Sequence, residues 1–318
     1  MSFTANVKNE VTELNTDRSE KIAELTGFLR SSCKDFSNFE VYTENINIAK
    51  RMFSFINEIY NFDCEITEGN NTLFTAKKVY YLLIHDNIDY MLKDLAIIDE
   101  NGEFKPTTSQ YIIGSLDEIK AYIRGSFLAC GSINDPKTSQ YHLEMLFDRK
   151  EESVFVQRLL NEFELNAKIL LRDKKYMVYI KDSDDISDFL IIIGANKAVM
   201  YYENIRAYKE QINITNRLNN CEQANTDKIL MSSNEQIKDI NLIVEKMGIE
   251  FLDDKLQEVV TYRLKYPEAS LLELSEIITL ETNKKITKSG LNHRFRKLKE
   301  IANRCRNMDV NEWKKIIY

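Results

Sequence analysis

The sequence has few of the residues that build disulfide frameworks, metal sites or membrane spans. Its five cysteines (Cys33, Cys64, Cys130, Cys221 and Cys305) are scattered with no C-x-x-C pair, and its three histidines lie far apart. We therefore expect buried, reduced thiols, no metal and no cofactor. No apolar run approaches the roughly 18 residues that span a bilayer, and the first residues lack the pattern of a signal peptide. These absences predict a cytoplasmic protein with no membrane partner.

Glycine and proline are also scarce, at 9 and 3 of 318 residues, while 43% of the residues are hydrophobic and 29% are charged. This composition is typical of an ordered, helix-rich protein and excludes a fibrous or largely disordered chain. At about 100–200 residues per domain, the length favours two domains.

The charge is unevenly distributed along the chain. A net charge of −7 alone argues against a nucleic-acid partner. However, residues 284–315 contain eleven Lys or Arg against three acids, a balance of +8, so the remainder carries −15. A basic end on an acidic body is typical of a separate DNA-contacting module.

The first two-thirds of the sequence contain one pattern twice, about a hundred residues apart. Helices predicted at 22–33 and 119–131 each carry a glycine on one face, and each is followed by a strand, a helix, two strands and a closing helix. The predicted strands are 39–43, 64–66 and 79–86 in the first unit and 141–147, 167–170 and 176–182 in the second. Each unit has a one-sided sheet and needs its twin to complete a core. The pattern predicts one α+β domain of two repeats over residues 1–212, paired about the glycine-bearing helices.

A polar stretch at 213–220 predicts a joint, because asparagine and threonine weaken helices. We place the linker at 213–222 and an all-α domain at 223–318. Its first helix, 222–247, ends at Gly248. A second helix, 253–265, carries Leu256, Val259, Val260 and Leu264 on one face, and a third begins at a capping box formed by Ser270 and Glu273.

The last main helix is basic and amphipathic. Leu291, Phe295, Leu298, Ala302 and Cys305 form its apolar stripe, and Ser289 is the expected N-terminal cap. Three successive helices, the last basic, predict a helix-turn-helix whose final helix enters the major groove of double-stranded DNA. The candidate DNA-binding residues are Lys284, Lys285, Lys288, Ser289, Asn292, His293, Arg294, Arg296, Lys297 and Lys299. The alternative interpretation is a solvated basic face on an ordinary helical bundle.

The two glycine-bearing helices resemble the paired LAGLIDADG helices of homing endonucleases. Those enzymes need an acid near the end of each helix, because paired carboxylates hold the metals that activate water. With Gly27 and Gly125 aligned to the first glycine of the motif, the acid positions hold Ser32 and Cys130. Neither residue is a ligand for a hard cation, so the resemblance implies a domain without catalytic residues.

The chain as a whole resembles the WhiA family. The stretches that carry the resemblance are 122–134 with 141–144, 216–225, 266–274 and 287–297. The resemblance implies a transcription factor that regulates sporulation in filamentous actinobacteria and influences cell division and chromosome segregation in other Gram-positive bacteria. It also implies that DNA recognition rests on residues 270–304. The sequence departs from the family at Cys130, where glycine is usual, and in a longer connection at 280–286.

Three hypotheses follow for function. The first is a DNA-binding regulator, not an enzyme, with another transcription regulator or RNA polymerase as a further partner, a place on the nucleoid and no small-molecule substrate. The second is an active endonuclease that uses other acids, such as Glu24 or Glu144. The third is an N-terminal domain that serves as a docking platform for protein or a small ligand, since its surface is acidic.

Overall fold

The computed structural model describes residues 2–33, 39–70 and 78–307. Within it, the chain divides into two compact units, Met1–Glu210 and Gln211–Tyr318. The predicted cations Lys314 and Lys315 lie outside the described residues. Among the described residues, no helix is both long and apolar enough to cross a bilayer.

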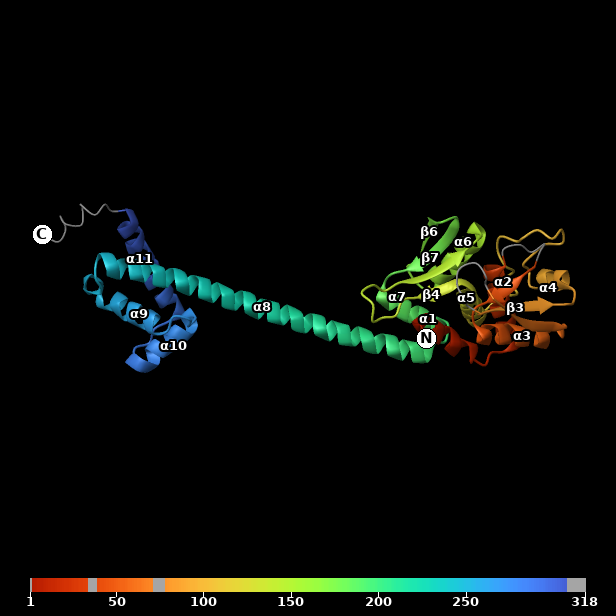
Figure 1. Cartoon of the computed structure of the whole chain (residues 1–318), viewed down its shortest axis with the longest axis horizontal. Helices are drawn as coiled ribbons and strands as arrows, with labels where there is room; N and C mark the ends of the chain where they lie inside the picture. The colour runs from red at the N-terminus through yellow and green to blue at the C-terminus, as the bar shows by residue number, and fades with distance from the viewer. Residues whose placement is uncertain (1, 34–38, 71–77, 308–318) are drawn as a thin grey trace. The chain divides into compact units, whose positions relative to one another are not determined.

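The first unit begins with helix α1, which packs beside the first repeat. That repeat has the predicted order of helix, strand, helix, two strands and helix (Figure 1). Helix α1 spans Phe3–Thr12. The elements of the repeat are α2 (Arg18–Ser32), β1 (Val41–Thr43), α3 (Ile46–Tyr60), β2 (Cys64–Asn70), β3 (Lys78–Ile84) and α4 (Ile88–Asp94). The three strands form an antiparallel sheet in the order β1-β3-β2, with Val41 opposite Leu82 and Ile66 also opposite Leu82.

The second repeat follows the same order with one strand added. Its elements are α5 (Leu116–Cys130), β4 (Gly131–Ile133), β5 (Leu143–Phe147), α6 (Lys150–Glu162), β6 (Lys168–Arg172), β7 (Lys175–Ile180) and α7 (Ser183–Ile192). The antiparallel sheet has the order β4-β5-β7-β6. The extra strand, β4, was not predicted, because three residues directly after a helix are too short to show an alternating pattern.

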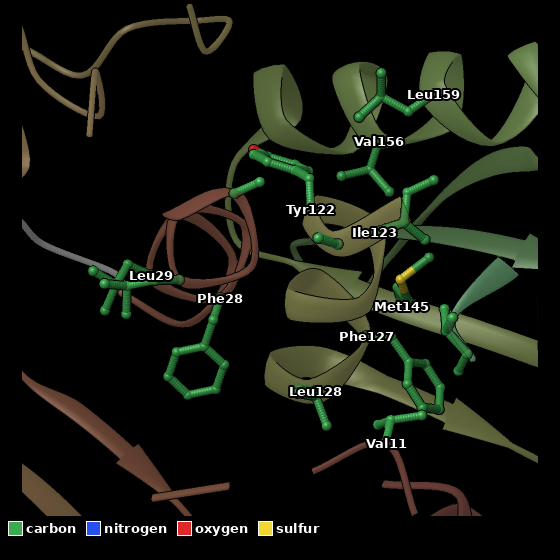
Figure 2. Packing of buried hydrophobic residues seen from close by; sticks show 14 of the residues in the cluster. Val11, Phe28, Leu29, Tyr122, Ile123, Phe127, Leu128, Met145, Val156 and Leu159 are labelled. Atoms are coloured by element: carbon green, nitrogen blue, oxygen red, sulfur yellow. The ribbon is translucent and has the colours of Figure 1, made fainter. Parts of the chain in front are cut away.

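One continuous hydrophobic core joins the two repeats. Figure 2 shows α2 and α5 side by side, with Phe28 and Leu29 on α2 and Ile123 and Phe127 on α5 directed into the surrounding core. Alternate residues of β5, among them Met145, point into the same core. The prediction that each repeat completes the core of the other is therefore confirmed.

The division expected near residue 212 falls beside the boundary between the two units, but the break in the helix expected at 213–222 is wrong. Those residues lie inside one helix, α8 (Asn196–Lys246), which also contains the separately predicted 222–247 helix. The start of α8 is held by Glu10, whose carboxylate accepts hydrogen bonds from the backbone amides of Lys197 (2.6 Å) and Ala198 (2.9 Å). No proline or glycine interrupts the helix, and each asparagine or threonine lowers helix propensity by only about 0.7 kcal/mol or less. Unfavourable propensity alone is too small to end a helix that is anchored at both ends.

The second unit is a small helical bundle built around the end of α8. It contains a short 3-10 helix (Ile249–Phe251), α9 (Asp254–Lys265), α10 (Leu271–Thr282) and α11 (Lys288–Asn307) (Figure 1). Ile240 and Ile243 of α8 pack in its core with α9, α10 and α11. Gly248 follows α8 with a φ of 88°, as a glycine that ends a helix requires.

On α9 the predicted apolar face is correct at Leu256, Val259 and Val260 but wrong at Leu264, which is 43% exposed. Arg263 is buried in its place. Its guanidinium donates hydrogen bonds to the Ala269 carbonyl (2.6 Å) and the Ser233 hydroxyl (3.1 Å). A buried guanidinium with these partners links three segments of the bundle, which an apolar side chain would not do.

Candidate DNA-binding surface and paired glycine helices

Helix α11 is positioned by its apolar stripe and by a tight turn before it. Leu291, Phe295, Leu298, Ala302 and Cys305 are all buried, as predicted. The stripe fixes which side of the helix faces solvent, because residues three and four apart share one face.

The turn that leads into α11 is built by α10. The capping box at Ser270 and Glu273 begins α10 as predicted, with both hydrogen bonds present. The helix ends at Asn283, which adopts a left-handed conformation (φ 53°). In the connection, the Thr279 hydroxyl accepts a hydrogen bond from the Ile286 amide at 3.1 Å. This bond ties the longer connection to α10 and fixes where α11 starts.

The cap of α11 is Thr287 and not Ser289. The helix begins at Lys288, and the Thr287 hydroxyl accepts a hydrogen bond from the Gly290 amide at 3.1 Å. Ser289 therefore lies within the first helical turn, with its residue exposed. The sequence contains two cap-forming residues two positions apart, and propensity alone does not distinguish them.

Nine of the ten predicted DNA-binding residues are exposed. Lys284 and Lys285 lie in the connection before α11. On α11 itself the exposed members are Lys288, Ser289, Asn292, His293, Arg296, Lys297 and Lys299. The structure thus brings most of the predicted residues onto the solvent side of one helix, opposite its buried stripe.

Arg294 differs from the other predicted residues. Its guanidinium lies 3.2 Å from the carboxylate of Glu258 on α9 and donates a hydrogen bond to the Lys255 carbonyl at 3.4 Å. Its side chain is 21% exposed. Arg294 therefore holds α11 against α9, at the border between the core and the exposed basic face.

Two further cations near the end of α11 were not among the candidates. Arg304 is exposed, whereas Arg306 forms an ion pair with Asp239 on α8. Lys299 lies 3.8 Å from Glu235, with its own side chain 60% exposed. Arg304 follows Arg296 and Lys297 by about two helical turns, and this spacing would have identified it from the sequence. The partner of Arg306 is 67 residues away and leaves no local signal.

The pairing of α2 with α5 requires a glycine on each helix. A Cβ atom placed on Gly27 would lie 2.2 Å from the Tyr122 carbonyl oxygen, and one on Gly125 would lie 2.0 Å from the Glu24 carbonyl oxygen. Both distances are far inside van der Waals contact, so only glycine allows the two backbones to approach this closely.

A buried ion cluster around Glu24 fixes the same interface. The Glu24 carboxylate accepts hydrogen bonds from Arg51 on α3 (2.6 and 2.9 Å) and from Arg124 on α5 (2.7 Å). The Glu24 side chain is fully buried. All its charge is neutralised by two guanidinium groups, so Glu24 is structural and the hypothesis that it is a catalytic acid loses its support.

A second buried cluster is formed by Glu152 on α6. Its carboxylate accepts hydrogen bonds from Arg30 on α2 (2.7 Å) and from the Tyr122 hydroxyl on α5 (2.6 Å). Burial and the neighbouring carboxylate raise the pKa of Tyr122 well above its usual range, so this hydroxyl stays protonated and donates. Each cluster contains residues of both repeats. The carboxylate comes from the first repeat in one cluster and from the second repeat in the other. Neither cluster leaves a local pattern in the sequence.

The positions at which an endonuclease carries its acids end α2 and α5. Ser32 is the last residue of α2, and Cys130 is the last residue of α5. The Cys130 thiol donates to the Ser126 carbonyl at 3.4 Å, and burial raises its pKa to about 12, so it stays protonated at neutral pH. Across residues 2–33, 39–70 and 78–307, no cluster of three or more His, Cys, Asp or Glu side chains is arranged to hold a metal ion.

Glu144, the other acid considered for catalysis, lies on β5. Its carboxylate is 3.1 Å from His142 Nε2 and 4.0 Å from Arg172. It is partly buried and faces the outer side of the second sheet. Within the described chain it belongs to no group of three or more His, Cys, Asp or Glu side chains that could hold a metal ion.

Comparison with known proteins decides the family. Three family models match consecutive parts of the chain: the WhiA N-terminal LAGLIDADG-like domain at residues 18–98, the WhiA LAGLIDADG-like domain at 119–211 and the WhiA C-terminal HTH domain at 215–302. The chain belongs to the WhiA family. The predicted fold class, two LAGLIDADG-like repeats followed by a helical helix-turn-helix domain, is thereby confirmed.

Relatives of this WhiA family member cover almost its whole length. It is 37% identical over 311 residues to the "Probable cell division protein WhiA" of Bacillus subtilis, and 36% identical to the protein of the same name from Lysinibacillus sphaericus. Both alignments cover 96% of this chain and 98% of the relative. The crystal structure titled full-length DUF199/WhiA from "Thermatoga maritima" matches with a TM-score of 0.58 at 24% identity, over 96% of this chain and 99% of that chain, and supports the fold alone.

Proposed function

We propose that this WhiA family member is a sequence-specific DNA-binding transcriptional regulator that acts in cell division, chromosome segregation or sporulation and does not cut DNA. The relatives bear the name of a cell division protein. The proposal places the protein on the nucleoid in the cytoplasm, with double-stranded DNA as its partner.

The observation that carries the proposal is the exposed basic face of α11. Arg296 and Lys297 lie on the side opposite the buried stripe, and exposed Lys288 lies in the first turn, next to the cap. An α-helix fits the major groove, and the start of the second helix of such a motif contacts base edges. The face therefore has the charge and the geometry to bind a duplex.

The face has two kinds of DNA-contacting residue. Ser289, Asn292 and His293 lie near the start of α11, where hydrogen bonds to base edges specify sequence. The lysines at 284, 285, 297 and 299 are more suited to phosphates, which position the protein on the duplex. Arg294 acts as a positioning residue, because its contact with Glu258 sets how α11 lies on α9.

The test is DNA binding by the full chain. Genome-wide mapping of bound sites, followed by binding assays on the recovered duplexes, identifies target sequences. Replacing Arg296 and Lys297 together by alanine should weaken binding about 10- to 100-fold. The matched control is the pair Arg217→Ala and Lys228→Ala, two exposed cations on α8. Equal affinity of both variants and the parent chain would contradict the proposal.

The absence of cleavage has its own test. Ser32 and Cys130 occupy the acid positions, and Glu24 is held by two arginines. We expect supercoiled plasmid to stay intact with the full chain and magnesium. Nicking that persists in the parent chain and disappears in Glu144→Ala would support the endonuclease hypothesis instead.

A second function, protein docking, is favoured by the outer face of the first sheet. The ring centroids of Tyr42 and Tyr81 lie 5.9 Å apart there, and Leu83 is 38% exposed. Glu65 on the neighbouring strand adds negative charge. An exposed aromatic and acidic surface suits a protein partner, such as another regulator or RNA polymerase, better than a phosphate backbone. Chemical-shift mapping tests this assignment. Adding purified RNA polymerase or the other regulator should shift signals of this sheet in the parent chain, and the shifts should be smaller in Tyr42→Ala.

A further inference from the structure

The outer face of α10 combines acidic and apolar residues in one groove. Glu268, Glu273 and Glu276 border a floor of Ala269, Ile277 and Leu280, with a volume of ≈ 500 Å³. Leu280 is 79% exposed and the adjacent Leu272 is 53% exposed. Exposed leucines that gather with Ile277 on one surface form an apolar patch, and such patches mark candidate interaction surfaces.

Within the described residues of the second unit, this groove is open to solvent. Leu274 and Ile278 on the opposite side of α10 are fully buried in the core of the bundle. Glu273 uses its carboxylate to bind the Ser270 amide, which begins the helix. In the part of the chain that the structure describes, neither Glu268 nor Glu276 forms an ion pair within 4.0 Å. Two of the three carboxylates are therefore available to a partner.

The sign of the charge excludes a duplex as the occupant. Glu273 and Glu276 on α10 and Glu268 just before it repel phosphates, whereas the exposed face of α11 carries cations. One bundle thus presents two surfaces of opposite sign, and each selects a different class of partner.

We propose that the groove on α10 is a docking surface for a cationic amphipathic helix of a protein partner. Apolar side chains at helical spacing fill the floor between Ala269 and Leu280, and lysine or arginine side chains beside them pair with Glu268 and Glu276. Residues 271 to 280 of α10 span about 14 Å, which matches between two and three turns of a partner helix. The docking surface is inferred without DNA binding. Only the statement that the partner meets this protein on DNA rests on the proposed function.

The probe for this surface is a fluorescein-labelled 18-residue helical peptide of leucine and lysine with one apolar stripe. The control probe replaces every lysine with glutamate. Fluorescence anisotropy with the full chain should detect binding of the lysine peptide and none of the glutamate peptide. Failure of the lysine peptide to bind overturns the proposal.

Charge reversal locates the peptide on the chain. The double variant Glu268→Lys and Glu276→Lys should weaken binding of the lysine peptide at least tenfold. Glu245→Lys and Glu250→Lys, two exposed acids of the same unit, change net charge equally and should alter the affinity less than twofold. Equal losses in the two pairs would mean diffuse attraction to an acidic protein and would overturn the assignment.

The apolar floor has a separate test. Leu280→Ser removes a side chain that is largely exposed, so folding is preserved, and thermal unfolding by circular dichroism verifies this. Peptide affinity should fall at least fivefold. Unchanged affinity in this variant would overturn the groove as the binding site.

DNA binding distinguishes failure of this inference from failure of the proposed function. Glu268→Lys with Glu276→Lys should retain DNA affinity or increase it, because two acids near a polyanion are replaced by cations. Arg296→Ala with Lys297→Ala should lose DNA and still bind the peptide. A loss of both partners in either double variant contradicts two separate surfaces.

Discussion

The buried arginines of the first unit and the exposed cations on α11 of the second unit have opposite roles. In the first unit, the Arg30, Arg51 and Arg124 side chains are 0%, 7% and 6% exposed, and each is paired with a buried carboxylate. On α11 of the second unit, Arg296 and Lys297 are exposed on the side opposite the core. Buried pairs contribute to the fold and are screened little by salt, while exposed cations attract phosphates and are screened strongly.

Arginine side chains therefore have two roles in this chain, one in packing helices and one in binding a partner. A buried guanidinium determines which helices pack together, because its hydrogen-bond donors need fixed acceptors. An exposed guanidinium attracts a partner of opposite charge. Variants at the two places should therefore differ in what they impair and in how salt changes the result.

The largest effect is expected at Glu24. Glu24→Ala removes the acceptor of two buried guanidinium groups. Arg51 loses the Glu24 carboxylate and Arg124 keeps only Glu20, at 3.5 Å, so the free energy of unfolding should fall by about 3–5 kcal/mol. Urea unfolding followed by circular dichroism measures this change. Glu222→Ala on the exposed part of α8 is the control and should change stability by less than about 0.5 kcal/mol. A loss below 1 kcal/mol for Glu24→Ala would show that the cluster is not a structural anchor.

The exposed pair on α11 should respond to salt instead of to urea. Arg296→Ala with Lys297→Ala should leave unfolding nearly unchanged and reduce the slope of log affinity against log salt by about two. Fluorescence anisotropy of a labelled target duplex at several salt concentrations gives the slope. An unchanged slope would mean that neither side chain reaches a phosphate.

Arg294 tests the border between the two classes. Arg294→Ala breaks a partly exposed pair with Glu258, so stability should fall by about 1 kcal/mol or less. DNA affinity should fall less than in the Arg296 and Lys297 double variant, with little change in the salt slope. A reduction of the slope by one would instead identify Arg294 as a direct phosphate contact.

The smallest effect is expected at the start of α11. Thr287→Ala should destabilise the first turn by about 1 kcal/mol, because the Gly290 amide loses its acceptor. Ser289→Ala should have little effect on the helix and should alter only DNA binding. Hydrogen exchange of the first-turn amides compares the two variants, and faster exchange in Ser289→Ala alone would restore Ser289 as the cap.

Local features of the sequence predicted the elements well. The two glycine-bearing helices, the capping box at Ser270 and the apolar stripe on α11 depend on residues within one or two turns of each other, so periodicity contains them. The acid positions at Ser32 and Cys130 followed from alignment of two glycines, and the structure places both at helix ends.

Features that depend on distant partners could not be predicted. Glu24 and Arg124 are a hundred residues apart, and a buried carboxylate has the same letter as an exposed one. The burial of Arg263 has no signal in the sequence, because its shortest hydrogen bond goes to a carbonyl oxygen, which every residue has. The helical course of 213–222 depends on anchoring at both ends of α8, which outweighs the weak local propensity.

Because each ion cluster contains residues of both repeats, neither repeat can complete its buried charge pairs alone. If the connection between α4 and α5 were cut, a fragment ending there would keep Glu24 and Arg51 but lose Arg124, and it would retain Arg30 without Glu152. Its complement would have the reverse deficit. Each fragment would bury a charge without its partner and expose the glycine-bearing face of its helix, so we expect neither to fold alone and both to regain structure when mixed.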